Sequence, residues 1–491
     1  MIVIGVGHLA DHLGVHRNTI RNWIREGKLP ARSAPGKGYM LKEDDFNKVC
    51  QEFGLDPARL KVRRLPSRSP GGLASDFAAP EVRSIGPRST RLRPNPQWAD
   101  ACLTCGSCAS ACPLSGVDGL DPRKALRMVT LGLEDELIES QWPWKCTLCG
   151  KCEDACPMNL ELVAMFRAVR GLRPRDQVPG PLHKGVQMCL NRGNNLGIPR
   201  EDFLFLLEEL GQELAAGECP GFTVPVDRQG ANLLVTVNSK EPFGEPDDLK
   251  HWWKIFHAAG ESWTVPSQDW EGVNWGLFTG DDEAMRTLVG RVVDNMRRLD
   301  CKTLLLPECG HAYYATRLGL QKWFAQEAQG FEVLSIFDLL LRYLREGRIR
   351  VDPGVHRQLT TYHDPCHYTR KSLKAFGQSY AEEGRWITRQ CCPDFVEMYP
   401  GHEGNYCCGA GGGAWAMPFK EERVFYGRIK AQQIRKTGAR LVIAPCHNCR
   451  DQILKSLNQE YQLDVEVKYI WELVADSLIL PARPVQPRGE E

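Results

Sequence analysis

Two cysteine runs with the same internal spacing constrain this chain more than any other feature of its sequence. Both read Cys-x-x-Cys-x-x-Cys-x-x-x-Cys-Pro; the first holds Cys102, Cys105, Cys108 and Cys112, and the second holds Cys146, Cys149, Cys152 and Cys156. The chain has 20 cysteines in 491 residues, and residues 1–14 lack the pattern of a secretory signal. Cysteines of such chains bind metals more often than they form disulfides. We therefore expect two metal sites in this region.

The spacing of both runs is that of bacterial ferredoxins, in which three close thiolates hold one cubane and the fourth crosses to the other cluster. Cluster one would then use Cys102, Cys105, Cys108 and Cys156, and cluster two would use Cys146, Cys149, Cys152 and Cys112. Zinc usually draws two Cys-x-x-Cys pairs, so two 4Fe-4S cubanes are favoured. Apolar residues at helical spacing between 122 and 140 predict a helix. Residues 97–175 are therefore predicted to form an α-helical, two-cluster ferredoxin module.

A third group of cysteines surrounds the adjacent pair Cys407 and Cys408. Neighbouring side chains point in different directions in a helix or a strand. Both thiols can therefore reach the same site only if the backbone forms an irregular turn. The glycine tract at 409–413 supplies residues that can form such a turn. Cys366 lies upstream, and Cys446 and Cys449 lie downstream. Five thiols are thus expected to converge on one site.

The C-terminal part of the chain has the pattern of a decayed repeat. Short apolar segments at 233–237, 303–306 and 333–336 match segments at 359–363, 441–444 and 465–467 in order and spacing. Strands that alternate with helices predict two parallel α/β halves, at 231–350 and 351–482, related by pseudo-twofold symmetry. A helical connector at 176–230 precedes them, and a tail at 483–491 follows.

Aligning the two halves places residues 308–311, which include Cys309 and His311, beside residues 446–449. The first half has no counterpart of Cys366 or of the Cys407-Cys408 pair, so it would lack a complete metal site. Both residues nevertheless follow a predicted strand, at the edge where open α/β folds bind ligands. Cys309 and His311 are therefore the predicted catalytic residues, for contact with a substrate thiol or for proton delivery.

Residues 1–55 predict a small helix-turn-helix domain. Leu9, Ala10 and Leu13 form the inner face of one helix, and Ile20 and Trp23 form that of a second. The segment resembles the winged helix-turn-helix of the MerR and excisionase families. That resemblance implies DNA contacts from Arg17, Asn18 and Arg21, while a docking role remains the alternative. Residues 56–96 are rich in Pro, Gly, Ser and Arg and are predicted to be a linker.

The second half resembles the cysteine-rich CCG domain of heterodisulfide reductase catalytic subunits. Residues 97–480 as a whole resemble the HdrD-like iron-sulfur subunits, including those of the DsrK and TmcB/HmcF type. The resemblance implies that Cys366, Cys407, Cys408, Cys446 and Cys449 bind one noncubane 4Fe-4S cluster, with zinc as the alternative. The sequence departs from the family in having one CCG motif and in carrying the N-terminal module.

Several cysteines and histidines remain outside these sets. Cys391 and Cys392 could form a surface thiol pair or supply alternative ligands, and Pro393 and Asp394 favour a turn without a ligand role. His363, His367 and His447 flank ligand cysteines and are predicted to donate hydrogen bonds to sulfur. The isolated residues Cys50, Cys189, Cys219 and Cys301 are predicted to be small buried side chains.

The leading functional hypothesis is an iron-sulfur electron-transfer subunit of a heterodisulfide-reductase-like complex, an oxidoreductase active with partner subunits. Its third site would react with a disulfide, a thiol or a quinone-linked partner, and its partner would be a membrane cytochrome b or a soluble flavoprotein. The alternative is a redox-sensing DNA-binding regulator. A net charge of +1 excludes a polyanion-binding design for the whole chain. No apolar run reaches the ~18 residues of a membrane span, and a cytoplasmic location, at most peripheral to a membrane complex, is expected.

Overall fold

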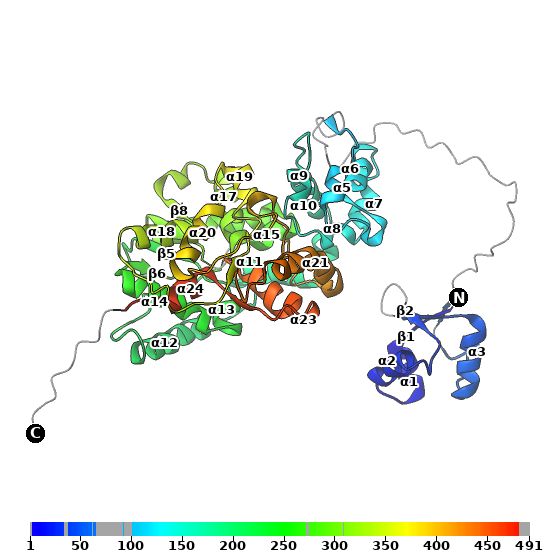
Figure 1. Ribbon diagram of the computed structural model, residues 1–491. Helices are drawn as coiled ribbons and strands as arrows, with labels where there is room; N and C mark the ends of the chain where they lie inside the picture. Colours follow the sequence, from blue (N-terminus) through cyan, green and yellow to red (C-terminus); the bar gives the residue numbers. More distant parts are fainter. Residues whose placement is uncertain are drawn as a thin grey trace, which may run out of the picture. The chain divides into compact units, whose positions relative to one another are not determined.

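The computed structural model describes residues 2–33, 38–60, 62–64, 92, 101–271, 274–307 and 309–480. The chain divides into two compact units, Met1–Ser84 and Ile85–Glu491. Figure 1 shows the first unit in dark blue and the helices and sheets of the second from cyan to red. The two units are described separately.

The first unit packs three helices with a small antiparallel sheet of order β2-β3-β1-β4. Leu9, Ala10 and Ile20 are buried in its core, and Trp23 stacks on Phe53, as the predicted inner faces require. Its elements are β1 (Ile2–Gly5), α1 (Val6–Leu13), α2 (Arg17–Arg25), β2 (Arg32–Ser33), β3 (Gly38–Leu41), α3 (Glu43–Glu52) and β4 (Val62–Arg64).

The predicted linker at 56–96 starts too early. Residues Val62–Arg64 form β4, which pairs with β1 from Ile2↔Arg64 to Ile4↔Val62. The basic composition of this segment concealed the strand, because its pairing partner lies at the far end of the unit's sequence. Sheet pairing of this kind depends on tertiary context more than on local propensity.

Helices and loops, without a strand, make up residues 101–216 of the second unit. One helix was predicted between 122 and 140, but Gly132 adopts a left-handed conformation (φ 71°) and divides the segment into two. The elements are α5 (Ser107–Ala111), η1 (Val117–Gly119), α6 (Pro122–Thr130), α7 (Glu134–Glu139), α8 (Trp142–Lys145), α9 (Lys151–Asp154), α10 (Leu162–Gly171), η2 (Arg175–Gln177), α11 (Gly180–Arg192) and α12 (Arg200–Ala216).

Two parallel sheets follow, with matching strand connections. The first has the order β6-β5-β7-β8 and the second β11-β10-β9, in which Thr360 of β9 also forms a parallel bridge to Phe395. The strands are β5 (Leu233–Val235), β6 (Trp263–Thr264), β7 (Thr303–Leu305), β8 (Glu332–Leu334), β9 (Thr360–Tyr362), β10 (Leu441–Ile443) and β11 (Glu466–Lys468). The six predicted strands occur; five are shorter than predicted, β11 is shifted by one residue, and β6 was not predicted.

Helices connect the strands of both sheets (Figure 1). Those of the first sheet are α13 (Lys240–Gly244), α14 (Asp247–Ala259), α15 (Asn274–Thr279), α16 (Asp282–Arg298), α17 (Gly310–Trp323), η3 (Glu327–Gly330) and α18 (Ile336–Arg345). Those of the second are α19 (Arg370–Phe376), α20 (Ala381–Cys391), η4 (His402–Gly404), α21 (Lys420–Thr437), α22 (His447–Gln452), the π-helical η5 (Ile453–Leu457), α23 (Asn458–Glu460) and α24 (Ile470–Asp476).

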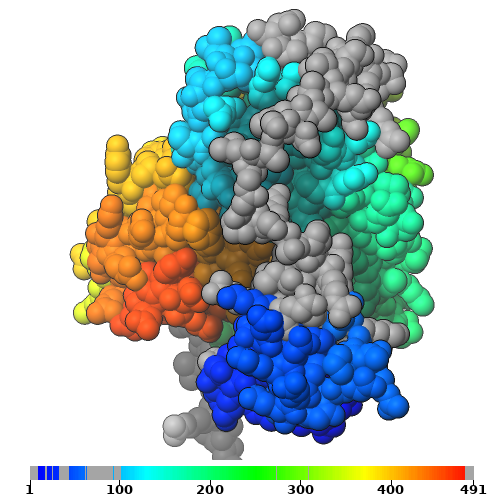
Figure 2. Space-filling model, turned by 90° about the vertical axis from the view of Figure 1, so that its right-hand side faces the viewer, coloured from blue at the N-terminus to red at the C-terminus, as the bar shows by residue number. Residues whose placement is uncertain are grey.

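The helical part and the two sheets share one hydrophobic core. A single cluster of buried side chains runs from Leu114 and Leu126 through Leu304 to Leu441 and Trp471. Arg428 of α21 donates to the carbonyl oxygen of Pro113 at 2.9 Å, and Lys145 pairs with Glu422 at 2.8 Å. Figure 2 shows the orange segment that includes α21 beside the light-blue segment around residue 110. The cysteine runs are therefore packed against the sheets as part of one unit.

Candidate metal centres

The two cysteine runs line two separate cavities, and each cavity takes one thiol from the other run. Cys102, Cys105 and Cys108 share the first cavity with Cys156. Cys146, Cys149 and Cys152 share the second with Cys112. Four thiols around each cavity fit the donor set of a 4Fe-4S cubane, in the crossed arrangement that ferredoxin spacing implies.

Equivalent turns shape the two cavities. Thr104 and Leu148 have φ of 51° and 50°, and the glycines two residues later, Gly106 and Gly150, have φ of 85° and 78°. Left-handed residues at both places turn the backbone around the thiols, and Leu148 N donates to Cys146 Sγ at 3.4 Å. The two runs therefore repeat the same local fold as well as the same spacing.

The two cavities differ in their distance from solvent. Cys105 is exposed, whereas Cys149 and Cys152 are buried. Burial raises the pKa of the Cys108 thiol to about 11, and that of the Cys146 thiol to about 11 as well. The first cavity thus lies at the surface of the unit, and the second lies inside it.

The five cysteines of the CCG region form one connected and buried set. Cys366 follows β9, Cys446 is the N-cap residue of α22, and Cys449 lies in its first turn. Cys408 Sγ lies 3.4 Å from Cys449 Sγ. Hydrogen-bonding contacts join Cys366 to Cys407 and Cys446 to Cys449. The irregular turn expected at the adjacent pair is present, since Gly409 has φ 103°.

The second cavity and the CCG thiols are in direct contact. A hydrogen bond joins the Cys149 thiol to Cys407, and Cys149 Sγ lies 2.9 Å from the Tyr426 hydroxyl. The hydrogen bond to Cys407 and burial together raise the pKa of the Cys149 thiol well above its usual value. Tyr426 was not identified from the sequence, where it is one tyrosine of a polar helix.

The glycine tract allows this close approach. A Cβ on Gly411 would lie 2.6 Å from the carbonyl oxygen of Thr147, and one on Gly412 would lie 2.8 Å from that of Cys146. Any larger residue would push the second cysteine run away from the CCG turn. The glycines therefore allow the backbone of the CCG region to pack directly against the backbone of the second cysteine run.

Cys309 and His311, the two residues proposed from the first half, lie near the Cys446 thiol. Cys309 is the N-cap residue of α17 and accepts from Ala312 N at 3.4 Å. Contacts with the Cys309 and Cys449 thiols lower the pKa of the Cys446 thiol. The His311 ring also packs against that of His367, with 3.9 Å between the centroids and an angle of 43° between the ring planes. Both residues of the first half thus lie next to a thiol of the second half.

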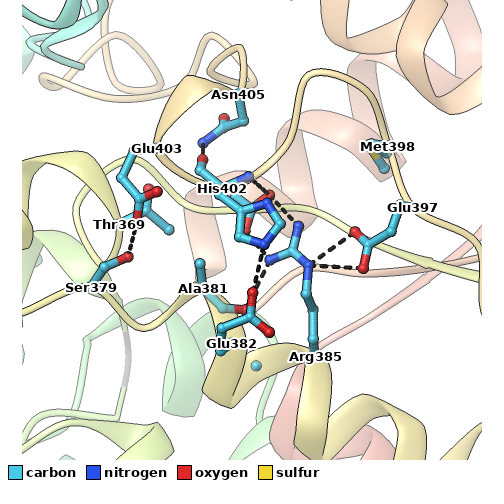
Figure 3. Close-up of polar contacts among 12 residues, drawn as sticks. Thr369, Ser379, Ala381, Glu382, Arg385, Glu397, Met398, His402, Glu403 and Asn405 are labelled. Carbon is cyan, nitrogen blue, oxygen red and sulfur yellow. Dashed lines mark hydrogen bonds and ion pairs between the residues drawn. The ribbon is translucent and has the colours of Figure 1, made fainter.

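A buried ion pair fixes the loops that carry Cys366 and Cys407. Asp364, which is 1% exposed, accepts from Arg385 at 2.7 and 2.9 Å and from His402 N at 2.8 Å. Figure 3 shows Arg385 between Glu397 and the loop of His402, and Asn405 bonded to that loop at 2.6 Å. Asp364 was missed in the sequence, although a carboxylate next to Pro365-Cys366 could have suggested a positioning role.

Two buried arginines join the cysteine runs to the CCG region. Arg170 donates to the carbonyl oxygens of Cys146 and Pro143 in the helical part, and to those of Phe278 and Gly412. Arg370 donates to the carbonyl oxygens of Cys149 and Asn405 at 3.0 and 2.8 Å. Burial lowers the pKa of Arg170 to about 10. Sequence reasoning missed both residues because their acceptors are backbone groups distant in the chain.

The three flanking histidines have different surroundings. His367 Nδ1 lies 3.4 Å from Cys366 Sγ, as predicted. His447 instead contacts Glu241 at 2.9 Å and the Tyr469 hydroxyl at 2.6 Å, so the predicted bond to sulfur is wrong for this residue. His363 lies within 4.8 Å of Cys408 and Cys449 in a group able to hold a metal, and burial lowers its pKa to about 3.

The remaining cysteines lie away from the candidate centres. Cys391 and Cys392 are both 0% exposed, so the surface thiol pair considered from the sequence is wrong. Cys392 contacts Thr360, at the end of β9 opposite to Cys366. Cys50, Cys189, Cys219 and Cys301 are buried, as predicted.

The predicted DNA contacts Arg17, Asn18 and Arg21 belong to α2. Their side chains lie outside the described residues.

Among the described residues, no helix has both the length and the apolar character needed to cross a membrane.

The fold and its thiol-lined cavities define a mixed α/β iron-sulfur protein with a helical ferredoxin-like module. Three domain families match the chain: a helix-turn-helix domain over residues 4–52, a 4Fe-4S dicluster domain over 98–160 and a cysteine-rich CCG domain over 360–453. These matches indicate iron-sulfur clusters in both cysteine-rich regions.

Several relatives of the chain are redox proteins. The Hdr-like menaquinol oxidoreductase iron-sulfur subunit of Archaeoglobus profundus is 23% identical over 358 residues, which cover 62% of this chain and 61% of that protein. The HdrD protein of the dihydromethanophenazine:CoB–CoM heterodisulfide reductase of Methanosarcina barkeri is 27% identical over 198 residues, 40% of this chain and 46% of that protein. The EtfAB:quinone oxidoreductase of Syntrophomonas wolfei is 24% identical over 166 residues, 34% of this chain and 21% of that protein.

The chain is homologous to these Hdr-like and HdrD proteins. The matched part spans about three fifths of the length of the Archaeoglobus relative. A glutamate racemase from Bacillus anthracis, aligned over 51% of this chain and 79% of its own, shares 13% identity and a TM-score of 0.24, which carries no argument about fold.

Proposed function

We propose that this protein is an electron-transfer subunit of a heterodisulfide-reductase-like complex, with three redox sites in series. The observation that carries the proposal is the contact between Cys149 of the second cysteine run and Cys407 of the CCG turn. Cys105 is exposed at the other end of the series. Electrons would therefore pass between a partner at the surface and a buried site at which chemistry takes place.

The ligand sets of the three sites follow the thiols that the structure brings together. Cys102, Cys105, Cys108 and Cys156 would hold one cubane, and Cys146, Cys149, Cys152 and Cys112 the other. Cys366, Cys407, Cys408, Cys446 and Cys449 would hold a noncubane 4Fe-4S cluster, for which zinc is the competing metal. When bound, such clusters supply one-electron transfer and an iron that can take a substrate sulfur.

Cys309 and His311 would act on the substrate at the third site. A disulfide needs two electrons and two protons to become two thiols, so a proton donor must stand beside the sulfur. His311 is 3% exposed, and its ring packs against that of His367, which orients it. Cys309 is held by Ala312 N and by Asn274 Nδ2 at 3.8 Å. Their positions support contact with substrate sulfur for Cys309 and proton delivery for His311.

The domain organisation proposed from the sequence supports this assignment. The two α/β halves at 231–350 and 351–482 have matching strand connections, and only the second carries the ligand set. In such an arrangement the first half supplies Cys309 and His311 to a site that the second half builds. The module at 97–175 and the connector at 176–230 belong with these halves to the electron-transfer part of the chain. The N-terminal domain would have a separate role, in docking or in DNA binding. The redox relatives of the chain give no support to a regulator.

The partners would be a membrane cytochrome b subunit or a soluble flavoprotein, because a cluster-only chain exchanges single electrons and needs another protein to collect them. Twenty cysteines without a predicted disulfide framework fit a reducing compartment, so we place the complex in the cytoplasm or on the cytoplasmic face of a membrane.

Metal analysis of anaerobically purified protein tests the proposal. Iron and acid-labile sulfide should match two cubanes and one further 4Fe-4S cluster, and Cys407→Ser should remove the iron of that further cluster alone. Oxidation in the presence of a thiol should give an electron paramagnetic resonance signal that Cys407→Ser abolishes. Zinc in the third site, with iron for the two cubanes only, would contradict the proposal.

A further inference from the structure

A cavity of about 1010 Å³ lies between α10 of the cysteine-run module and helices α17 and α19 of the two α/β halves. None of the five CCG thiols lines it, and it is separate from the two cavities of the cysteine runs. A volume of this size holds a small organic molecule.

One wall of the cavity is apolar. Its lining includes Val163, Ala164 and Ala168 of α10, Leu318 of α17 and Leu277 of α15. These side chains offer contacts to hydrocarbon or ring carbon and no hydrogen bonds. The body of a ligand in this space would therefore be apolar.

Most of the cavity's charges are neutralised by ion pairs within the protein. Lys374 pairs with Glu153 at 2.9 Å, and both Arg167 and Lys322 pair with Asp282. Such pairs leave little net charge to recognise a ligand.

Lys371, which also lines the cavity, takes part in none of these ion pairs. Its side chain is buried, with 5% of the residue exposed, and the negative groups that act on its charge are the Cys366 and Cys149 thiols and Glu153. Its Nζ contacts His367 Nε2 at 3.0 Å and lies 4.1 Å from the centre of the Tyr314 ring. Because Glu153 already pairs with Lys374, the Lys371 ammonium can bind an anion or another strong acceptor in the cavity.

The floor of the cavity adjoins both redox sites inside the unit. His367 Nδ1 lies 3.4 Å from Cys366 Sγ, so one imidazole separates Lys371 from a CCG thiol. Leu148, which also lines the cavity, donates its backbone N–H to Cys146 Sγ. A molecule in the cavity would thus lie next to the second cubane and the third site.

We propose that this cavity binds a small amphipathic organic anion, with its apolar body against α10 and α17 and its oxygen-bearing head at Lys371. The inference rests on the proposed function in one respect, which is that the natural ligand is a molecule exchanging electrons at the third site. The competing role for Lys371 is to balance the negative charge of the clusters without contacting any ligand.

Isothermal titration calorimetry of the anaerobic, cluster-loaded protein tests the proposal with two probes of equal size, 1-naphthalenesulfonate and the neutral 1-naphthalenemethanol. The sulfonate should bind more tightly than the alcohol. Lys371→Met should weaken sulfonate binding by about 10- to 100-fold, the loss expected for one charge-assisted hydrogen bond, and leave the alcohol unchanged. Lys371→Arg should retain most of the affinity.

Lys374→Met is the matched control, because it replaces another lysine of the cavity, one turn further along α19. The affinity of this variant for the sulfonate should differ from that of the unmodified protein by less than threefold. Ala168→Trp should block both probes by filling the apolar wall, with iron content intact. Equal binding of the sulfonate to Lys371→Met and the unmodified protein would overturn the proposal, as would failure of the loaded protein to bind either probe. Those results would leave the metal content, and hence the proposed function, untouched. If Lys371→Met loses its clusters, the other two variants test the proposal: Lys371→Arg should keep most of the affinity for the sulfonate, and Ala168→Trp should bind neither probe.

Discussion

Cys309 and Cys446 occupy the same place relative to two different sheets, and a hydrogen bond joins their thiols. Each is the N-cap residue of the helix that follows an inner strand: Cys309 lies between β7 and α17, and Cys446 lies between β10 and α22. The carboxyl ends of parallel strands are where α/β folds bind ligands. The two sheets thus bring one such end each to a common site.

Replacing Cys309 tests whether its thiol contacts the substrate or binds the iron of the third cluster. Cys309→Ala should leave iron and sulfide contents unchanged, because the five CCG thiols remain. It should lower the rate of disulfide reduction by about 100-fold if the thiol contacts substrate. His311→Phe should lower the same rate by a similar factor and flatten its pH profile, because Phe keeps the ring packing and removes the proton. Loss of iron in Cys309→Ala would instead make Cys309 a ligand.

Each cubane is proposed to take three thiols from one cysteine run and one from the other. Variants in different runs should therefore affect the same cluster. Cys156→Ser should alter the same electron paramagnetic resonance signal of the reduced protein as Cys105→Ser, since both thiols line the first cavity. Cys112→Ser should group with Cys152→Ser, since both line the second. The outcome that contradicts the assignment is the reverse grouping, in which each variant follows its own run in the sequence.

The cysteine sets and most strands could be predicted because their signals are local. The spacing of Cys102 to Cys112 already contains the turn that the structure shows, and the apolar segments at 303–306 and 441–444 contain β7 and β10. The two-residue strand β6 could not be predicted, because Trp263–Thr264 carries no alternation and is defined by pairing with β5. The contact of Cys149 with Cys407 was also beyond reach, since it depends on how the module packs on the sheets.

The buried ion pair of Asp364 and Arg385 should be needed for the third site and not for the cubanes. Asp364→Asn leaves Arg385 without its bidentate partner and weakens the bond to His402 N, so the loops of Cys366 and Cys407 lose a common anchor. We expect a loss of about 3 kcal/mol in the free energy of unfolding. Iron analysis should show the third cluster depleted and the cubanes retained.

Glu382→Gln is the control for this variant. Glu382 contacts the same loop through His402 Nε2 at 2.6 Å, but its side chain is 73% exposed. Exposed pairs of this kind contribute little, so stability should change by less than about 0.5 kcal/mol. Equal effects of the two substitutions would show that the buried pair has no special role.

Arg170 should contribute more to stability than any exposed arginine of the module. Arg170→Met leaves the carbonyl oxygens of Cys146, Phe278 and Gly412 without a buried donor. Each unsatisfied group costs about 1–3 kcal/mol, so a loss of at least ~3 kcal/mol is expected in urea unfolding of the anaerobic protein. Arg173→Met removes one exposed bond to the Glu139 carbonyl oxygen and should change stability by less than about 0.5 kcal/mol. Similar losses in both variants would refute this assignment.

Arginine anchors of this type illustrate what sequence reasoning could not supply. Arg170 and Arg370 sit in ordinary helical patterns, and the feature that distinguishes them is the set of backbone carbonyls they reach. The burial of Cys391 and Cys392 has the same origin, because the turn suggested by Pro393 says nothing about what packs over it. Local sequence predicts turns and strands here, and long-range packing decides which polar groups are buried.

Glu271 makes the stability of the second unit depend on pH. Its carboxyl is buried, accepts from Ser239 Oγ at 2.9 Å and Asn195 N, and lies 3.8 Å from the Cys189 thiol and near the Trp275 side chain. Burial raises its pKa from 4.5 to about 7. The folded state then binds the proton more tightly than the unfolded state. This contribution to stability is fully present below pH 4.5 and is lost as the pH rises through about 7.

Glu271→Gln keeps the shape of the side chain and cannot ionise, so it should remove this pH dependence. Relative to the variant, the unmodified protein should lose about 2 kcal/mol in the free energy of unfolding between pH 5.5 and pH 8. Urea unfolding followed by tryptophan fluorescence at the two pH values measures the difference, and other titrating groups cancel because both proteins contain them. An exposed carboxyl, Glu208→Gln, serves as the control and should show no such difference. Parallel pH profiles for Glu271→Gln and the unmodified protein would mean that the buried carboxyl titrates normally.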